Sequence, residues 1–565
     1  MVLTIGRALL AMLIPTVVLA QTPADTGYAA ALRYIDAAAR EQMLEEGTPG
    51  MAVALVAGGE VLGVRTYGYA DLVARSPVTP DSRFLAGSIS KAFTAVALLQ
   101  LQEEGLVDVH RPVTDYLPWF KVRSRYAPIT LHHLLTHTAG LPRDRSDLPS
   151  SPYTALALRD REVGAAPGER FAYSNIGYQL LSLVIEEVEG RPFREAIRRR
   201  ILEPMGMSET APEVTQAGRL STATGYQYLY DDRPPLPGAS LVPVAWGEYS
   251  AGDANIVTTA PDLARFLLGL LAQGGGGSRR LLQPASFARM VQRTVPAPEL
   301  GESAFYGYGV ILGTLEGDPV LWHSGGMAGF RAMLLGDADE RLGVVILMNG
   351  PGNPRRLAEY ALRALIAVRR GKAPPPVVVA APPDVIPGAA DYAGTFTDGA
   401  GRRLSVEATG DRLWLIDAGG RLPLLRGGDA DQFLFRDSAW ARYPIRFGRQ
   451  QGRVVELVHG PAWFAAAGYA GPRSFVVPGE WPAYAGHYRA QVPYYSNYRV
   501  IVRKGELLLV SPEGLEEPLV PIGRREFRVG RDARSVERVT FSDVISGRAL
   551  RLNLSGTEYY RTMTP

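Results

Sequence analysis

A serine and a lysine three residues apart form the first pair in this sequence that could do covalent chemistry. They are Ser88 and Lys91, in the run Ser88-Ile89-Ser90-Lys91, which opens an apolar stretch with helical spacing. Residues three apart share a helix face, so the hydroxyl and the amine should be neighbours. A serine hydroxyl is a weak nucleophile until a base takes its proton, and an adjacent amine can do so or assist another base. Because only four of the 565 residues are lysines, this spacing is uncommon by chance.

The run Tyr173-Ser174-Asn175 is a second candidate, in a loop-like stretch just before a predicted helix. A phenol beside an ammonium gives up its proton more readily, so Tyr173 could share the role of base with Lys91. The Asn175 amide has both donors and an acceptor, so it could hold the lysine and a substrate carbonyl together. The competing interpretation is a buried tyrosine followed by a helix-capping asparagine.

A third candidate is the run His323-Ser324-Gly325-Gly326, which precedes a strand-like stretch. Its small residues would let a substrate lie against a strand edge. A backbone N–H there could help to form an oxyanion hole, which stabilises the negative charge of a tetrahedral intermediate. The competing interpretation is an ordinary glycine-rich turn that carries one imidazole.

The remaining histidines favour structure over chemistry. His133 and His137 have the i, i+4 spacing of a metal-binding pair, with His132 beside them. No glutamate lies between the two, no third ligand is apparent, and Gly140-Leu141-Pro142 ends the segment at once. We therefore expect no metal site and no cofactor. The sequence also has no Gly-x-Ser-x-Gly elbow and no phosphate-binding glycine loop.

The helices and strands that must position these residues are expected to form one mixed α/β unit over residues 24–370. Apolar periodicity indicates a helix over 89–102, directly after the serine, with Gly105 as a candidate C-cap. The other expected helices cover 29–46, 177–189, 193–203, 261–272 and 355–370, and the expected strands cover 51–56, 61–69, 307–313, 330–335 and 343–348.

The last third of the chain has a different pattern. Residues 371–389 are rich in proline, which favours an extended, semi-rigid linker. Beyond the linker, Tyr392-Ala393-Gly394-Thr395-Phe396 is matched by Tyr484-Ala485-Gly486-His487-Tyr488, and further pairs follow at similar spacing. The repeat predicts two small all-β units, residues 390–480 and 481–565, each an antiparallel barrel or sandwich.

Composition and the N-terminus bear on the compartment. The chain is 46% hydrophobic and 21% charged, with a formal net charge of +3, so nothing points to nucleic acid as a partner. It has no cysteine, which excludes disulfides and thiolate chemistry. Residues 1–20 have the form of a signal peptide, with Arg7, an apolar core and small residues before Gln21. We expect an exported protein, periplasmic or secreted, without a stable membrane span once the signal is cleaved.

Taken together, the three motifs resemble the serine β-lactamase and penicillin-binding protein superfamily, in its class C β-lactamase-related branch. That branch includes D-aminopeptidases, D-Ala-D-Ala carboxypeptidases and esterases. The resemblance covers about residues 25 to 370. It rests on the segments 84–91, 134–142, 171–177 and 258–266. It implies an α/β (α+β) catalytic domain with an antiparallel sheet and flanking helices, and the barrel-like tail is loosely similar to that of D-aminopeptidase-like enzymes.

The resemblance also implies a role for each residue. Ser88 would be the acylated nucleophile, Lys91 its proton partner and Tyr173 the general base. Asn175, His323, Ser324, Gly325 and Gly326 would bind the substrate, and the N–H groups of Ser88 and Gly326 would form the oxyanion hole. His323 would stand where many true β-lactamases have the lysine of Lys-Thr-Gly, a departure shared with peptidase and esterase relatives.

These features predict an exported serine hydrolase that cleaves peptides or amides with D-residues, or small esters. Its expected partner is a small-molecule or peptide substrate, with peptidoglycan-derived peptides among the candidates. Hydrolysis of β-lactams is the enzymatic alternative. A penicillin-binding sensor that is acylated without turnover, and a binding scaffold with a degenerate catalytic domain, are the alternatives from other classes.

Overall fold

A computed structural model describes residues 17–18, 25–143, 148, 150–236, 238–275, 280–417, 419–492 and 496–562. The predicted signal peptide, 1–20, lies outside the described residues except for the short strand β1 (Val17–Val18). Among the described helices, none combines the length and the apolar character needed to cross a membrane. The chain divides into two compact units, one of residues 1–227 and 240–379 and the other of residues 228–239 and 380–565.

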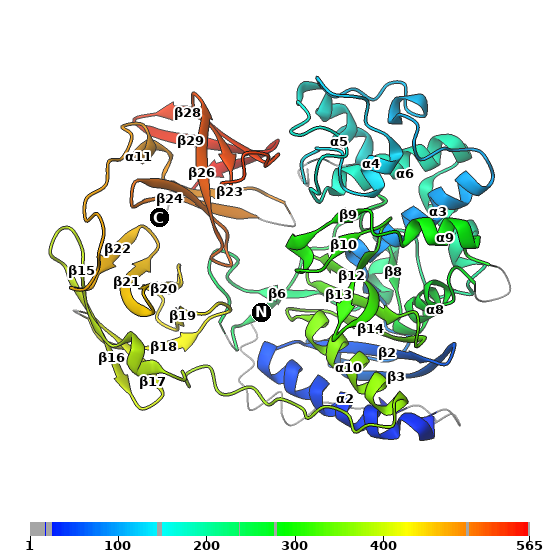
Figure 1. The fold of residues 1–565 in the computed structure, drawn as a ribbon, viewed down its shortest axis with the longest axis horizontal. Helices are drawn as coiled ribbons and strands as arrows, with labels where there is room; N and C mark the ends of the chain where they lie inside the picture. Colours follow the sequence, from blue (N-terminus) through cyan, green and yellow to red (C-terminus); the bar gives the residue numbers. More distant parts are fainter. Residues whose placement is uncertain are drawn as a thin grey trace. The chain divides into compact units, whose positions relative to one another are not determined.

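The first unit is built on a ten-stranded antiparallel sheet (Figure 1). The strand order is β1-β3-β2-β14-β13-β12-β11-β10-β9, and β4 pairs with β3. The strands are β2 (Gly50–Ala57), β3 (Glu60–Asp71), β4 (Ser76–Pro77), β9 (Val295–Pro296), β10 (Phe305–Tyr306), β11 (Ile311–Leu315), β12 (Asp318–Met327), β13 (Phe330–Asp337) and β14 (Leu342–Met348). Two small two-stranded sheets accompany it, β5 (Phe84–Leu85) with β8 (Val257–Thr258) and β6 (Tyr226–Tyr228) with β7 (Leu241–Pro243).

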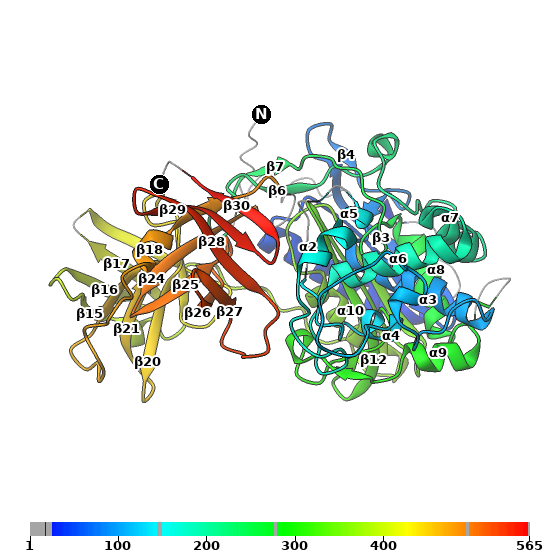
Figure 2. The ribbon, with the colours of Figure 1, turned by 90° about the horizontal axis from the view of Figure 1, so that it is seen from above.

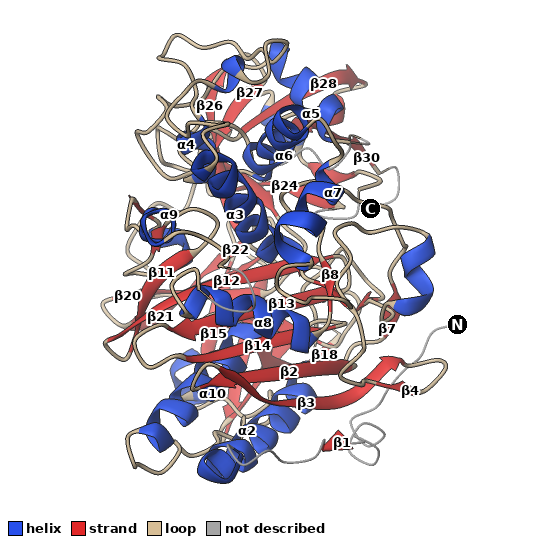
Figure 3. Ribbon diagram, turned by 90° about the vertical axis from the view of Figure 1, so that its right-hand side faces the viewer, coloured by secondary structure: helices blue, strands red, loops and turns tan. Residues whose placement is uncertain are grey.

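Both faces of this sheet are covered by helices. Strand β2 is buried along its whole length, so its alternate side chains serve two different cores. On one face, helices α2 (Asp25–Glu46) and α10 (Pro354–Arg369) pack against each other and against the sheet. On the other face, α8 (Ala260–Leu271) lies across β2, β13 and β14 (Figure 3).

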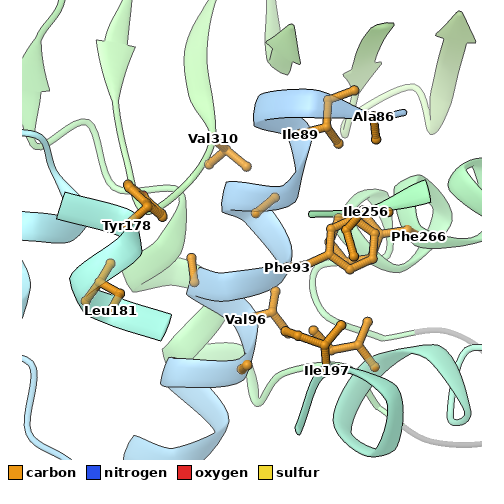
Figure 4. Packing of buried hydrophobic residues seen from close by; sticks show 14 of the residues in the cluster. Ala86, Ile89, Phe93, Val96, Tyr178, Leu181, Ile197, Ile256, Phe266 and Val310 are labelled. Carbon is orange, nitrogen blue, oxygen red and sulfur yellow. The ribbon is translucent and has the colours of Figure 1, made fainter. Parts of the chain in front are cut away.

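Helix α3 (Ser90–Glu103) lies at the centre of the larger core. Most of its residues are fully buried because they contact other elements on every side. Phe93 stacks on Phe266 of α8 with ring centroids 3.8 Å apart. Val96 and Ile197 lie beside this pair, whereas Leu181 lies on the opposite side of α3 (Figure 4). The remaining helices of this unit are α4 (Leu131–Leu135), α5 (Ser151–Ala157), α6 (Asn175–Glu189), α7 (Phe193–Ile197) and α9 (Pro284–Met290).

The second unit contains two closed eight-stranded barrels, most of whose strands are labelled in Figure 2. The first consists of β15 (Gly394–Thr397), β16 (Arg403–Thr409), β17 (Arg412–Asp417), β18 (Gly420–Arg426), β19 (Gln432–Phe435), β20 (Ile445–Gln450), β21 (Arg453–His459) and β22 (Ala462–Ala465). The second consists of β23 (Gly486–Arg489), β24 (Asn497–Arg503), β25 (Glu506–Val510), β26 (Glu516–Gly523), β27 (Glu526–Val529), β28 (Arg538–Ile545), β29 (Arg548–Leu554) and β30 (Thr557–Arg561), preceded by the short helix α11 (Trp481–Tyr484). Aromatic and aliphatic side chains fill both interiors.

The predicted fold class, an α/β (α+β) domain with an antiparallel sheet and flanking helices followed by two barrel-like units, is confirmed. Two local expectations were wrong. Residues 307–310 do not extend a strand, because the Gly307 N–H bonds to the Val310 carbonyl and closes a turn between β10 and β11. The predicted helix over 193–203 is α-helical only to Ile197 and then widens into a π-helical turn over Arg198–Leu202.

Candidate active site

Ser88 lies in a single 3₁₀ turn, Gly87–Ile89, that leads directly into α3. Gly87 has a φ of +55°, and a Cβ at this position would come within 2.6 Å of the Gly326 amide nitrogen. Only glycine satisfies both the left-handed backbone and this close approach. The turn therefore packs directly on strand β12, while the Ser88 side chain stays half-buried.

Lys91 is fully buried beneath Ser88. Its Nζ donates to Asn175 Oδ1 at 2.8 Å and to the Asp253 carbonyl at 3.0 Å, and it lies 3.0 Å from Ser88 Oγ. The two carbonyl oxygens can only accept, so they fix two of the amine's N–H groups. The Ser88 hydroxyl can either donate or accept, so a proton can pass between Ser88 and Lys91 along this third contact.

Tyr173 and Asn175 join this pair from the start of α6. The Lys91 Nζ lies 4.9 Å from the centroid of the Tyr173 ring, and the Arg143 guanidinium lies 5.5 Å from it, so two cations flank the phenol. Ser174 is the N-cap of α6, since its Oγ accepts from the Gly177 N–H. Asn175 is the first residue of the helix instead of its cap, which leaves its side chain available to Lys91.

The third motif lies on β12, where buried and exposed residues alternate. His323 and Gly325 face inward, whereas Ser324 and Gly326 are exposed. A Cβ at Gly325 would come within 1.8 Å of the Ala86 carbonyl oxygen, so the strand lies directly against the serine turn. β12 pairs with β13 as far as Met327 but with β11 only as far as Trp322. Among the described strands, none pairs with residues 323–327 on the β11 side.

The His323 side chain is buried on the inner face of β12, and both of its ring nitrogens have partners within the protein. Nδ1 lies 2.6 Å from the Ser324 carbonyl oxygen, so Nδ1 carries the proton and Nε2 accepts from the Tyr306 hydroxyl at 3.1 Å. Burial, and then the nearby Lys91 ammonium, lower the pKa of His323 to about 3. The imidazole is therefore neutral at physiological pH, and its two hydrogen bonds link β12 to Tyr306 inside the protein.

The two histidines with the spacing of a metal-binding pair, His133 and His137, have different surroundings in the fold. His133 forms a capping box with Thr130 at the start of α4, while His137 is buried among aromatic rings. His132 bonds through Nδ1 to the Tyr308 hydroxyl at 2.7 Å. Across the described residues, no group of three or more histidine, aspartate or glutamate side chains has the arrangement to hold a metal ion.

Two residues near the site were not predicted from the sequence. Asp253 supplies the carbonyl that holds Lys91, and its carboxylate accepts from the Tyr249 hydroxyl at 2.8 Å. Tyr306 supplies the hydroxyl bonded to His323. Asp253 lies 162 residues from Lys91 and acts through its backbone, so no spacing rule applies to it. The only sequence signal that could have indicated a role for Tyr306 is its position in the 305–309 segment, just before β11.

The chain is similar to several known proteins. The family model described as Beta-lactamase matches residues 35–368. "Protein flp" of Staphylococcus aureus (strain NCTC 8325 / PS 47) is 28% identical over 324 residues, which cover 55% of this chain and 61% of that protein. "Penicillin-binding protein 4*" of Bacillus subtilis (strain 168) is 28% identical over 316 residues, 52% of this chain and 66% of that protein. The chain thus spans less than two thirds of the length of these relatives.

Among solved structures, the octameric penicillin-binding protein homologue from Pyrococcus abyssi is similar to this chain with a TM-score of 0.56 and 26% identity. The similarity covers 77% of this chain and 99% of that one, so it extends past the sheet-and-helix unit.

Proposed function

This chain belongs to the Beta-lactamase family, and we propose that it is an exported serine hydrolase that works through an acyl-enzyme on Ser88. The observation that supports this most directly is the 3.0 Å contact between Ser88 Oγ and the amine of Lys91. The amine is fully buried, and two carbonyl oxygens fix its orientation. A half-buried hydroxyl next to a rigidly held amine is the arrangement that activates serine for attack on a carbonyl.

In the acylation step, Ser88 Oγ attacks the substrate carbonyl carbon and its proton passes to the Lys91–Tyr173 pair. The carbonyl oxygen gains negative charge and is stabilised by the backbone N–H groups of Ser88 and Gly326. Gly87 packs closely on Gly326, which supports this assignment because the turn that carries one donor lies against the strand that carries the other. The bond to the leaving group then breaks, and that group takes a proton from the same pair.

In the second step, water attacks the acyl-enzyme ester. The Lys91–Tyr173 pair takes a proton from the water, and Ser88 leaves with a proton to regenerate its hydroxyl. The end of β12, which pairs with β13 beyond the point where its pairing with β11 stops, supports an extended substrate beside Ser88, because main-chain groups of a strand can bind an extended peptide. The acyl portion of the substrate would run along residues 323–327.

The proposed substrates are peptides or amides with D-residues, including peptidoglycan-derived peptides, or small esters. In this motif a lysine would give a fixed positive charge, whereas His323 is neutral and buried. The motif therefore offers no permanent charge at this position for a substrate carboxylate, which favours uncharged esters and amides over anionic β-lactams.

A second candidate is a protein that reacts with β-lactams, either as a hydrolase or as a sensor that is acylated without turnover. The observation that favours it is the similarity to a relative named penicillin-binding protein 4*. The hydrolase and the sensor share acylation and differ only in the rate at which water releases the acyl group.

Intact-mass spectrometry separates these possibilities. A fluorophosphonate probe should add one adduct per chain, and the Ser88→Ala variant should add none. With a penicillin, no adduct is expected for an enzyme of uncharged substrates, a transient adduct for a β-lactamase and a lasting adduct for a sensor. Phosphonate labelling of Ser88→Ala at the wild-type rate would refute the proposed function.

A further inference from the structure

His137 is a buried residue in an unusual conformation at the back of the candidate site. Its φ is +57°, in the left-handed region that residues other than glycine seldom adopt, although asparagine, aspartate and histidine occur there more often than the rest. The residue is almost wholly buried. Its Nε2 has no hydrogen-bond partner within the part of the chain that the structure describes. A buried donor without a partner costs free energy, so the fold must favour this arrangement for another reason.

The hydrogen bonds of His137 indicate that reason. Its carbonyl oxygen accepts from the Ala172 N–H at 2.8 Å, and its Nδ1 accepts from the Ser174 N–H at 3.0 Å. These two bonds from one residue bracket Tyr173 on both sides along the chain. Because Nδ1 must accept, the ring proton must lie on Nε2, which accounts for the unpartnered donor.

The imidazole also contacts the Tyr173 side chain. The two rings are tilted by 34°, with centroids 4.3 Å apart, and the Lys91 Nζ lies 4.9 Å from the centroid of the same phenol ring. The ring centroids of Tyr178 and Tyr306 lie 5.1 and 4.6 Å from the centroid of the imidazole. Burial and the charge of Lys91 lower the pKa of His137 well below its usual value, so Nδ1 remains an acceptor at neutral pH.

We propose that His137 is a positioning residue that holds the Tyr173 phenol in place beside Lys91 by bonding the backbone on both sides of it. This inference rests on the proposed function, in which Tyr173 exchanges protons with Ser88 and Lys91. The left-handed φ is part of the arrangement, because it points the carbonyl and the ring of one residue at two N–H groups that lie two residues apart.

The test measures the second-order rate of fluorophosphonate labelling in the full-length chain. His137→Leu removes the Nδ1 acceptor, and it should slow labelling about 100-fold, the scale expected when a catalytic group moves by about 1 Å. His137→Asn should retain most of the rate, because the Asn Oδ1 can accept from the Ser174 N–H and asparagine tolerates this φ. His459→Leu is the matched control, since His459 is a histidine of the first barrel whose Nε2 lies 2.9 Å from the Trp440 carbonyl oxygen. It should label at the wild-type rate.

A double-mutant cycle separates positioning from general loss of structure. In a Tyr173→Phe background, adding His137→Leu should slow labelling by less than about twofold, because residues that act through one another do not have additive effects. Additive losses, or equal losses for Leu and Asn, would refute the role of His137 and leave the acyl-enzyme proposal intact. Labelling of Ser88→Ala would instead refute the acyl-enzyme proposal. If the Leu variant does not fold, His137→Gln, whose acceptor lies further from the backbone, replaces it and should be slower than Asn.

Discussion

The buried imidazole of His323 should make the catalytic unit less stable in mild acid. Its folded-state pKa is about 3, whereas an unfolded histidine titrates near 6.5. Between these values the unfolded chain binds a proton that the folded chain does not, so the free energy of unfolding falls as the pH falls through this window. At roughly 1.4 kcal/mol per pH unit, the loss from this one residue is about 2 kcal/mol at pH 5 relative to neutral pH, and it is fully recovered above about pH 7.

The comparison that isolates this effect is wild type against His323→Gln. The glutamine does not titrate, and its Oε1 can still accept from the Tyr306 hydroxyl. Urea unfolding at pH 5 and pH 8, with loss of fluorophosphonate labelling marking the transition of the catalytic unit, gives the free energy for each protein. The wild type should lose about 2 kcal/mol more than the variant between the two pH values. Equal losses would show that the imidazole takes up its proton in the folded state and is not held neutral.

Three further predictions concern the site and the barrels. Lys91→Ala and Tyr173→Phe should each lower kcat/KM of an activated ester by orders of magnitude, with a combined loss well below the product of the two; multiplicative losses would contradict a shared role. Gly325→Ala should lower both the melting temperature and the labelling rate, because its Cβ would meet the Ala86 carbonyl oxygen at 1.8 Å; wild-type values for both would contradict the packing. A fragment of residues 21–380 should fold and be labelled, yet be cut by proteases within residues 228–239 faster than the full chain. The reason is that Asp231 pairs with Arg489, which the fragment lacks; equal cutting rates would contradict this.

The relative positions of functional residues that are close in the sequence could be predicted from their spacing. Ser88 and Lys91 are three residues apart on a helical stretch, and that spacing alone brings their side chains together. The tail could be predicted as two all-β units because a repeat is visible along the chain itself. The family resemblance joined the more distant motifs, since Asn175 lies 84 residues from the Lys91 amine that it contacts.

What the sequence did not contain was the direction in which β12 presents its side chains. In the third motif, His323 stands where the resemblance places the lysine of Lys-Thr-Gly in many β-lactamases. The sequence alone does not show whether its imidazole faces a substrate or is hydrogen-bonded inside the protein. Which way His323 faces depends on the alternation of side chains along β12, which is set by its pairing with β13. It also depends on the Tyr306 hydroxyl, which bonds to His323 Nε2. The two hydrogen bonds that His137 accepts, from the Ala172 and Ser174 N–H groups, are likewise long-range, and His137 and Ser174 lie 37 residues apart in the chain.

The identity of the acylated residue can be measured directly, since Arg83 and Lys91 release the peptide of residues 84–91 on digestion with trypsin. That peptide contains Ser88 and Ser90. Ser90 is fully buried, and its Oγ accepts from the Ile256 N–H at 3.0 Å, so it is not free to react. After brief reaction with an activated ester and an acid quench, fragmentation of this peptide should place the acyl group on Ser88. An acyl group on Ser90, or on any other peptide, would contradict the acyl-enzyme on Ser88.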